Sequence, residues 1–317
     1  MKRFFKGVGY IILTLFVLLN MLSAFHAYKF THFYNSGAAV KKPELMNGWE
    51  KTQAILFGVN YPKKKVADLP QSPFKDFIIK TEDGLTLRGW LIKNNDSVAN
   101  KGAVLLFHGH ANNRGSIVNE AQAFINFGYT VYLIDFRAHG ESDGEICTIG
   151  YNESKDVKAL YDYAKNNFTD DQIVLYGISL GAATITKAVA DYPTIKPSKI
   201  ILEMPFASLT DAVKGRLRSM HLPEQPLAAL LTFWGGTQQG FWGFSHNPSD
   251  YVQKINCPVL LQWGVNDARV SKAETQILFN NIASKQKILV QYENSAHESL
   301  YKKEPEKWLE TVSKFLD

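Results

Sequence analysis

One stretch constrains the fold more than any other, the segment QIVLYGISLGAA at residues 172–183. Its apolar run predicts a buried strand over residues 173–176, which passes through a G-x-S-x-G turn into a helix from Ala182 to about Tyr192. Such a junction holds the serine in a strained backbone conformation, and a side chain at either flanking glycine would collide with the neighbouring strand or helix. We therefore expect Ser179 to stand out from the edge of a sheet.

The turn also predicts where a negative charge could be stabilised. The backbone N–H of Leu180 would lie at the N-terminus of the helix and point to the place where an oxyanion develops. The same short pattern fits an ordinary β-turn-α connection that uses glycines for tight packing. A serine hydrolase differs from this alternative because it needs an acid, and then a histidine, further along the chain.

From Phe74 onward, strand-like runs alternate with helix-like segments. A hairpin with an Asp-Gly turn is expected over residues 77–93. Further strands are expected at 103–107, 130–134, 199–204, 258–263 and 287–292, and further helices at 117–127, 151–166, 272–281 and 304–316. This alternation predicts an α/β fold, a doubly wound and mostly parallel sheet.

The alternation stops at about residue 206 and resumes after residue 250. The interrupting segment is rich in Leu, Phe, Trp and Gly. We predict a short helical lid, with a helix over Leu227–Phe233 and a loop from Gly235 to Gly243. The catalytic domain would then cover residues 74–317, preceded by a membrane-proximal segment over 29–73 that holds one amphipathic piece, Glu44–Phe57, with Leu45, Trp49, Ile55 and Leu56 as packing contacts.

The N-terminus carries an uncharged run of eighteen residues, Val8–Phe25. As a helix it would be about 27 Å long, close to the thickness of the bilayer hydrocarbon. Lys2, Arg3 and Lys6 precede it, so the positive-inside rule places the N-terminus in the cytoplasm. We predict an uncleaved transmembrane anchor (residues 1–28), with the catalytic domain on the periplasmic or extracytoplasmic side. A cleaved signal peptide is the alternative, although no clean A-x-A site follows the run.

Two residues complete a catalytic constellation with Ser179. Asp267 follows the strand expected at 258–263, and His297 follows the next one, so both lie on loops at the carboxyl ends of parallel strands. A serine hydroxyl needs a base within hydrogen-bond reach, and a buried carboxylate fixes the tautomer of the imidazole. Asp250 and Asp211 are weaker candidates for the acid because neither follows a predicted strand.

The segment FHGHANN, residues 107–113, directly follows another buried strand. We assign the second oxyanion donor to the main-chain N–H of His110, with Ala111 as the alternative. The side chains of His108 and His110 raise the alternative of metal ligation, but no further ligand stands at a suitable spacing. No metal or cofactor is expected.

Composition excludes some classes of partner. The net charge is only +5 and no basic stripe is interleaved with aromatic residues, so we expect no nucleic-acid partner. Cys147 and Cys257 are interpreted as small buried side chains, although a single disulfide between them stays open. The 45% of hydrophobic residues is sufficient for a large core. Oligomeric state is not predicted.

From residue 74 to the C-terminus the chain resembles the α/β-hydrolase fold superfamily. The resemblance rests on His108-Gly109, the loop from Asp135 to Gly144, the G-x-S-x-G turn, Gly264-x-x-Asp267 and His297-Glu298. Ala138 stands where the family usually has glycine, which implies slight strain in that loop. With its N-terminal anchor and short lid, the chain looks like the membrane-anchored abhydrolases and serine aminopeptidase-like proteins. The resemblance implies a triad of Ser179, Asp267 and His297.

We therefore expect a serine hydrolase that cleaves carboxylic esters or thioesters through an acyl-enzyme. The apolar lid and the anchor together favour a lipid-like acyl substrate, with Phe233, Trp234 and Trp242 as candidate substrate-binding residues. An aminopeptidase or amidase using the same triad is the alternative, with Glu298 or Glu203 holding the substrate amine. A catalytically silent, membrane-tethered binding protein is a third hypothesis.

Overall fold

The computed structural model describes residues 2–35, 41, 45–94, 100–167 and 172–317. Its centre is an eight-stranded sheet with the order β10-β9-β8-β7-β5-β6-β4-β3. The strands are β3 (Phe74–Lys80), β4 (Thr86–Ile92), β5 (Ala103–Phe107), β6 (Thr130–Ile134), β7 (Ile173–Ile178), β8 (Lys199–Glu203), β9 (Val259–Gly264) and β10 (Lys287–Tyr292). The six strands from β5 to β10 run parallel, and the β3–β4 hairpin lies antiparallel at one edge. The predicted fold class is confirmed.

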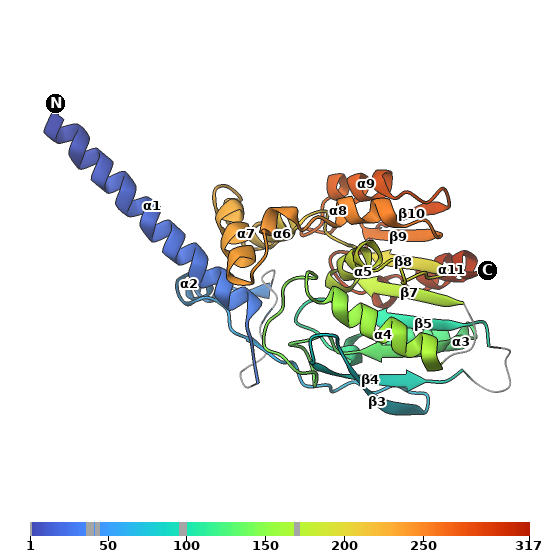
Figure 1. The fold of residues 1–317 in the computed structure, drawn as a ribbon. Coiled ribbons are helices and arrows are strands. Elements are labelled where there is room, and N and C mark those ends of the chain that lie inside the picture. Colours follow the sequence, from blue (N-terminus) through green and yellow to red (C-terminus); the bar gives the residue numbers. More distant parts are fainter. Residues whose placement is uncertain (1, 36–40, 42–44, 95–99, 168–171) are drawn as a thin grey trace.

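Helices cover both faces of the sheet (Figure 1). The helices α4 (Ser154–Asn167), α5 (Leu180–Asp191) and α9 (Lys272–Asn281) lie on one face, and α3 (Val118–Asn126) and α11 (Pro305–Leu316) lie on the other. Trp308 of α11 packs against Phe124 of α3 and Tyr176 of β7, which joins both helices to the centre of the sheet. The inner strands are buried on both faces, as continuous apolar runs require.

The lid contains two main helices, α6 (Leu209–Met220) and α7 (Leu227–Gln238), followed by the short α8 (Pro248–Tyr251). The prediction for the lid was wrong in two places. It omitted α6, and it placed Gly235 in a loop, whereas α7 continues through this residue to Gln238. The glycine at position 236 serves close packing and does not end the helix. A Cβ atom on Gly236 would lie 2.3 Å from the main-chain nitrogen of Gly243. Glycine therefore lets the returning chain lie directly against the helix.

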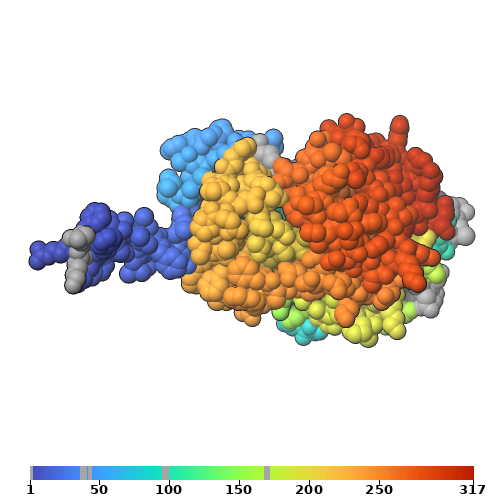
Figure 2. All heavy atoms as spheres, turned by 90° about the horizontal axis from the view of Figure 1, so that it is seen from above, coloured from blue at the N-terminus to red at the C-terminus, as the bar shows by residue number. Residues whose placement is uncertain are grey.

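The N-terminal helix α1 (Lys2–Thr31) extends away from the domain, and its C-terminal third lies beside the lid (Figures 1 and 2). Trp234 of α7 donates its indole N–H to Asn20, and Gln238 donates to the carbonyl of Ala24. Among the described residues, α1 is the one helix long and apolar enough to cross a membrane. The lid is thus attached to the base of this helix.

Residues 29–73 contain two short parallel strands, β1 (Phe33–Tyr34) and β2 (Tyr61–Pro62), which pair with each other. Phe33 also donates its N–H to the carbonyl of Glu145, in the segment between β6 and α4. The helix within residues 29–73, α2 (Gly48–Phe57), begins with a capping box formed by Asn47 and Glu50. Three of the predicted packing contacts were wrong, because Leu45, Trp49 and Leu56 are mostly exposed.

Candidate active site

The turn after β7 has the strained geometry that the sequence predicts. Ser179 has φ 52° and ψ −109°, and its N–H donates to the carbonyl of Glu203 on β8 at 2.7 Å. A Cβ atom on Gly181 would lie 2.2 Å from the carbonyl oxygen of Phe107, and one on Gly177 would lie 2.6 Å from the main chain of α5. Both glycines are therefore required for β5, β7 and α5 to approach this closely.

Three side chains from separate loops meet at this turn. The Nε2 atom of His297 lies 2.9 Å from the hydroxyl oxygen of Ser179, and its Nδ1 atom lies 2.7 Å from Oδ2 of Asp267. Asp267 follows β9 and His297 follows β10, so the carboxyl ends of parallel strands bring them to the same edge. The order is that of a nucleophile, a base and a carboxylate that orients the base.

The carboxylate of Asp267 is fully buried and both of its oxygens are occupied. Oδ2 faces His297, while Oδ1 accepts hydrogen bonds from the main-chain N–H groups of Arg269 and Val270 at 2.7 and 2.9 Å. Asp267 therefore also stabilises the turn that precedes α9. These two N–H groups fix the direction in which the second oxygen points.

The loop after β5 is held by histidines in their neutral form. Phe136 donates its N–H to Nε2 of His108, so Nδ1 must carry the proton and donates to the carbonyl of Gly109. In the same way, Ala111 donates its N–H to Nε2 of His139 at 3.1 Å. Burial lowers the pKa of His108 well below its usual range and lowers the pKa of His139 to about 4. Both rings therefore serve as structural links in this loop.

The hydrogen bonds of this loop determine which main-chain N–H group is available to bind an oxyanion. The N–H of Ala111 is already committed to His139, whereas the N–H of His110 has no partner among the described residues. The ideal Cβ position of Gly109 lies 3.7 Å from the Cβ atom of Ser179, which shows how closely this loop approaches the turn. Leu180 is the first residue of α5, where N–H groups have no acceptor within the helix.

The loop after β6 is braced by buried ion pairs. Arg114 pairs with Asp135, and Arg137 binds both Asp156 and Asp83. Ala138 adopts φ 62°, in the left-handed region that favours glycine. This conformation costs an alanine about 1–2 kcal/mol. The slight strain expected from alanine at this position is therefore present.

Glu203, at the end of β8, lies behind the turn and is completely buried. Its Oε1 atom accepts hydrogen bonds from Tyr176, Trp308 and Gln262, while Oε2 has no partner among the described residues. Burial raises the pKa of Glu203 to about 8, and the nearby carboxyl of Glu120 adds to this rise. The hypothesis that Glu203 binds a substrate amine is therefore wrong.

We expect Glu203 to make the free energy of unfolding depend on pH. Its folded pKa of about 8 lies above the ordinary value of 4.5, so between these values unfolding releases a proton. Stability should therefore fall as pH rises from about 5 to 8, by up to about 1.4 kcal/mol per pH unit for this one group. Urea unfolding midpoints measured at both ends of the range check this.

Glu203→Gln keeps the oxygen acceptor and removes the ionisation, so its unfolding midpoint should change less between pH 5 and 8 than that of the parent protein. Glu306→Gln, an exposed site on α11, is the control and should keep the parent slope. Equal slopes in Glu203→Gln and the parent would contradict this assignment.

The two cysteines are not joined. Cys147 is a buried free thiol and Cys257 is a partly buried one. The three aromatic residues proposed for substrate binding lie on the outer part of the lid. Trp234 bonds Asn20 of α1, Phe233 packs against Trp234, and Trp242 is more than half exposed.

The lid residues that line a cavity are different ones. They are Leu209, Val213, Arg216, Leu217, Met220, Leu222, Leu227, Leu231, Gly235 and Phe241. Phe233, Trp234 and Trp242 do not line this cavity, and their role in substrate binding stays a prediction. Aromatic character in the sequence marked the lid, but it did not indicate which face of each helix turns inward.

Comparisons with known proteins show several that the chain resembles in sequence or fold. A family model described as serine aminopeptidase, S33, matches residues 98–235. The esterase Pf2001 of Pyrococcus furiosus has a TM-score of 0.67 and 25% identity, covering 81% of this chain and 98% of the esterase. The uncharacterized protein YqkD of Bacillus subtilis is 24% identical, covering 76% of this chain and 78% of the relative.

A third relative has a stated lipid substrate in its name. The lysophosphatidylserine lipase ABHD12 of mouse is 24% identical over 54% of this chain and 43% of the lipase, so the match spans less than half of that enzyme. Taken with the sheet order and the serine turn, these similarities show that the chain has the α/β-hydrolase fold. The proteins that it resembles include an esterase and a lipase, and these similarities support a hydrolase.

Proposed function

We propose that the protein is a serine hydrolase that cleaves carboxylic esters or thioesters through an acyl-enzyme. The observation that carries this proposal is the hydrogen-bonded chain from Ser179 through His297 to Asp267, built on a strained turn. The hydroxyl of Ser179 attacks the substrate carbonyl while Nε2 of His297 takes its proton. Asp267 holds the proton on Nδ1 and stabilises the imidazolium that forms.

The tetrahedral intermediate needs donors for its oxyanion. We assign these to the main-chain N–H groups of Leu180 and His110, on either side of Ser179. His297 then protonates the leaving alcohol or thiol. In the second half of the cycle His297 activates water, which hydrolyses the acyl-enzyme and returns Ser179 to its free form.

An aminopeptidase activity is the second candidate, because the matching family model bears that name. Binding a substrate amine calls for a carboxylate near Ser179. Glu203 is buried within the sheet, whereas Glu298, beside His297, accepts one long contact of 3.4 Å from the N–H of Ala296 and is the carboxylate available for this role. The apolar cavity beside the lid favours acyl esters over peptides.

We also propose that α1 anchors the enzyme in a membrane, with its N-terminus in the cytoplasm. The helix exposes large apolar side chains along most of its length, from Phe4 to Phe25. An isolated helix of this composition is stable in hydrocarbon because all of its inner peptide groups are bonded internally. Lys2, Arg3 and Lys6 on the preceding side set the orientation.

The test of the proposed reaction is a comparison of two substrate classes. Purified full-length protein in detergent is assayed with p-nitrophenyl acyl esters and with aminoacyl p-nitroanilides. We expect turnover of the esters and little turnover of the anilides. Preference for the anilides would overturn the ester assignment in favour of the aminopeptidase, and inactivity on both substrate classes would contradict a hydrolytic role.

A further inference from the structure

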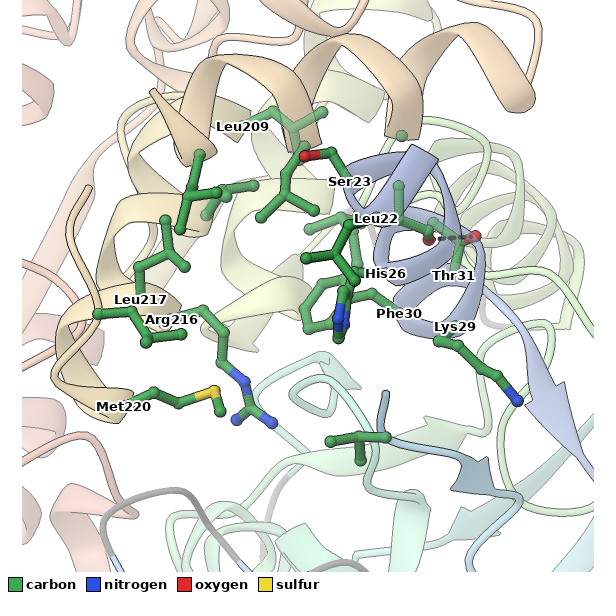
Figure 3. A pocket seen from close by; sticks show the side chains of 18 of the residues that line it. Leu22, Ser23, His26, Lys29, Phe30, Thr31, Leu209, Arg216, Leu217 and Met220 are labelled. Atoms are coloured by element: carbon green, nitrogen blue, oxygen red, sulfur yellow. Dashed lines mark hydrogen bonds between the residues drawn. The ribbon is translucent and has the colours of Figure 1, made fainter. Parts of the chain in front are cut away.

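A cavity of about 200 Å³ lies between α1, α2 and the two lid helices (Figure 3). The lining residues of α6 and α7 recur every three or four positions, so a single face of each lid helix turns inward, while α2 contributes Ala54 and Ile55. On α6 and α7 this face consists of Leu209, Val213, Leu217, Leu227, Leu231 and Gly235. On α1 it consists of Leu22, His26 and Phe30, which lie opposite the α6 side chains in Figure 3. The helix α1 thus forms one wall of the cavity.

Three of the polar side chains that line the cavity are hydrogen-bonded to other segments of the protein. His26 binds the carbonyl of Ile55 at 2.8 Å, and Arg216 donates to the hydroxyl of Tyr61 at 2.6 Å. Lys29 donates to the side-chain oxygen of Asn60 at 2.6 Å and points away from the cavity (Figure 3). The surface that remains is apolar, so the matching ligand is a hydrocarbon chain.

One part of the cavity wall lies against the loop after β5, which contains Gly109 and His110. Phe30 and Tyr61 line the cavity, and their rings also contact the ring of His110, with centroids 4.8 and 5.2 Å apart. Gly109, the residue before His110, lies against Ser179, as described above. A hydrocarbon chain in the cavity is therefore separated from Ser179 by the rings of Phe30 and Tyr61 and by the loop that contains His110.

Another part of the cavity wall lies near the point where α1 extends away from the rest of the protein. Residues 3–18 of α1 are all exposed, and Ser23 is the first buried residue after them. In Figure 2 the α2 region and the lid lie on either side of this end of α1. These two segments expose Trp49, Phe57 and Trp242. Exposed aromatic residues beside a membrane helix are typical of the bilayer interface. The cavity therefore begins at the level where hydrocarbon would surround the protein.

We propose that this cavity is an acyl-chain site for which the membrane helix α1 supplies one wall. The fatty-acyl chain of a membrane-derived ester lies between α1 and the lid, and its carbonyl carbon reaches Ser179 when the rings of Phe30 and Tyr61, which stand between the cavity and His110, move aside. The helix then has two roles, because the segment that anchors the enzyme also shapes its substrate site. This inference rests on the proposed ester hydrolysis for its catalytic meaning.

Gly235→Leu tests the site by filling it. No atom lies within 4 Å of an ideal Cβ at Gly235, so the added side chain enters open space, and leucine favours the helix more than glycine does. Gly9→Leu is the matched control, since Gly9 lies in the exposed part of α1 and also has nothing within 4 Å. Both variants are assayed as full-length protein with p-nitrophenyl acetate and p-nitrophenyl dodecanoate.

Burial of one methylene is worth about a four-fold change in affinity. Excluding two or more methylenes should lower kcat/KM of Gly235→Leu for the dodecanoate at least about ten-fold, with acetate hydrolysis within about two-fold of the parent. Gly9→Leu should match the parent on both esters. An unchanged dodecanoate rate, or an equal fall on both esters, would overturn the acyl-chain site while leaving the hydrolase assignment intact. If the parent cleaves neither ester, the proposed function itself fails.

A second readout does not depend on catalysis. Membranes containing the full-length protein are exposed to a photoreactive, diazirine-bearing palmitic acid, and cross-linked peptides are mapped. The site predicts cross-links to residues 209–220 of α6 that Gly235→Leu lowers several-fold and Gly9→Leu does not. Cross-links confined to the membrane-facing residues 8–20 would overturn the proposed site, whether or not the enzyme is active.

Discussion

Ser179→Ala should abolish turnover, lowering kcat for a short acyl ester by about 10⁵-fold or more while leaving KM almost unchanged. Without the hydroxyl there is no acyl-enzyme, and His297 has no proton to accept. Removing the nucleophile of a triad elsewhere costs about 10⁶-fold, and what remains comes from binding and the oxyanion donors. Steady-state assays on p-nitrophenyl acetate with freshly purified protein measure the effect.

Ser198→Ala is the matched control for this substitution. Ser198 lies just before β8, at the opposite end of the sheet from Ser179, where its hydroxyl bonds the carbonyl of Ile173 at 3.0 Å. We expect it to retain parent activity. A Ser179→Ala protein with more than about a hundredth of the parent rate would show that another group performs the attack.

Asp267→Asn should lower kcat by about 10³- to 10⁴-fold. The amide oxygen can still accept the N–H groups of Arg269 and Val270, so the turn is expected to fold as before. The amide NH₂ group would then face Nδ1 of His297 and force the proton onto Nε2. That tautomer cannot take the proton of Ser179, so the geometry survives while the base is lost.

Asp250→Asn serves as the control, because Asp250 is another acidic residue that the sequence offers for this role. It lies in α8, exposed, and accepts a hydrogen bond from Asn247. Its replacement should change kcat by less than about two-fold. If both variants kept parent activity, the carboxylate would have to come from elsewhere or be unnecessary.

Much of this site was predictable from the sequence because it depends on local chemistry. The two glycines around Ser179 are required by contacts shorter than 3 Å, so the turn is encoded within five residues. Asp267 and His297 follow strands that the apolar pattern identifies, and parallel strands bring their carboxyl ends together. The order of residues along the chain therefore predicted which side chains would meet.

The cavity was not predictable in the same way, because it depends on long-range packing. Val8–Phe25 is apolar enough to span a bilayer. Neither this run nor the residues that follow it indicate that Leu22, His26 and Phe30 would face a lid formed about two hundred residues later. Glu203 was misassigned for a related reason. Its three hydrogen-bond donors come from two other strands and α11, which no local pattern brings together.

The most direct test of the central claim is active-site labelling with a fluorophosphonate probe, followed by mapping of the modified peptide. Membranes that contain the full-length parent protein are compared with membranes that contain Ser179→Ala. A single adduct on Ser179 in the parent, and none in the variant, is the predicted result because only a serine activated by His297 displaces fluoride rapidly. An adduct on a different residue, or an unlabelled parent protein that is demonstrably folded, would contradict the account.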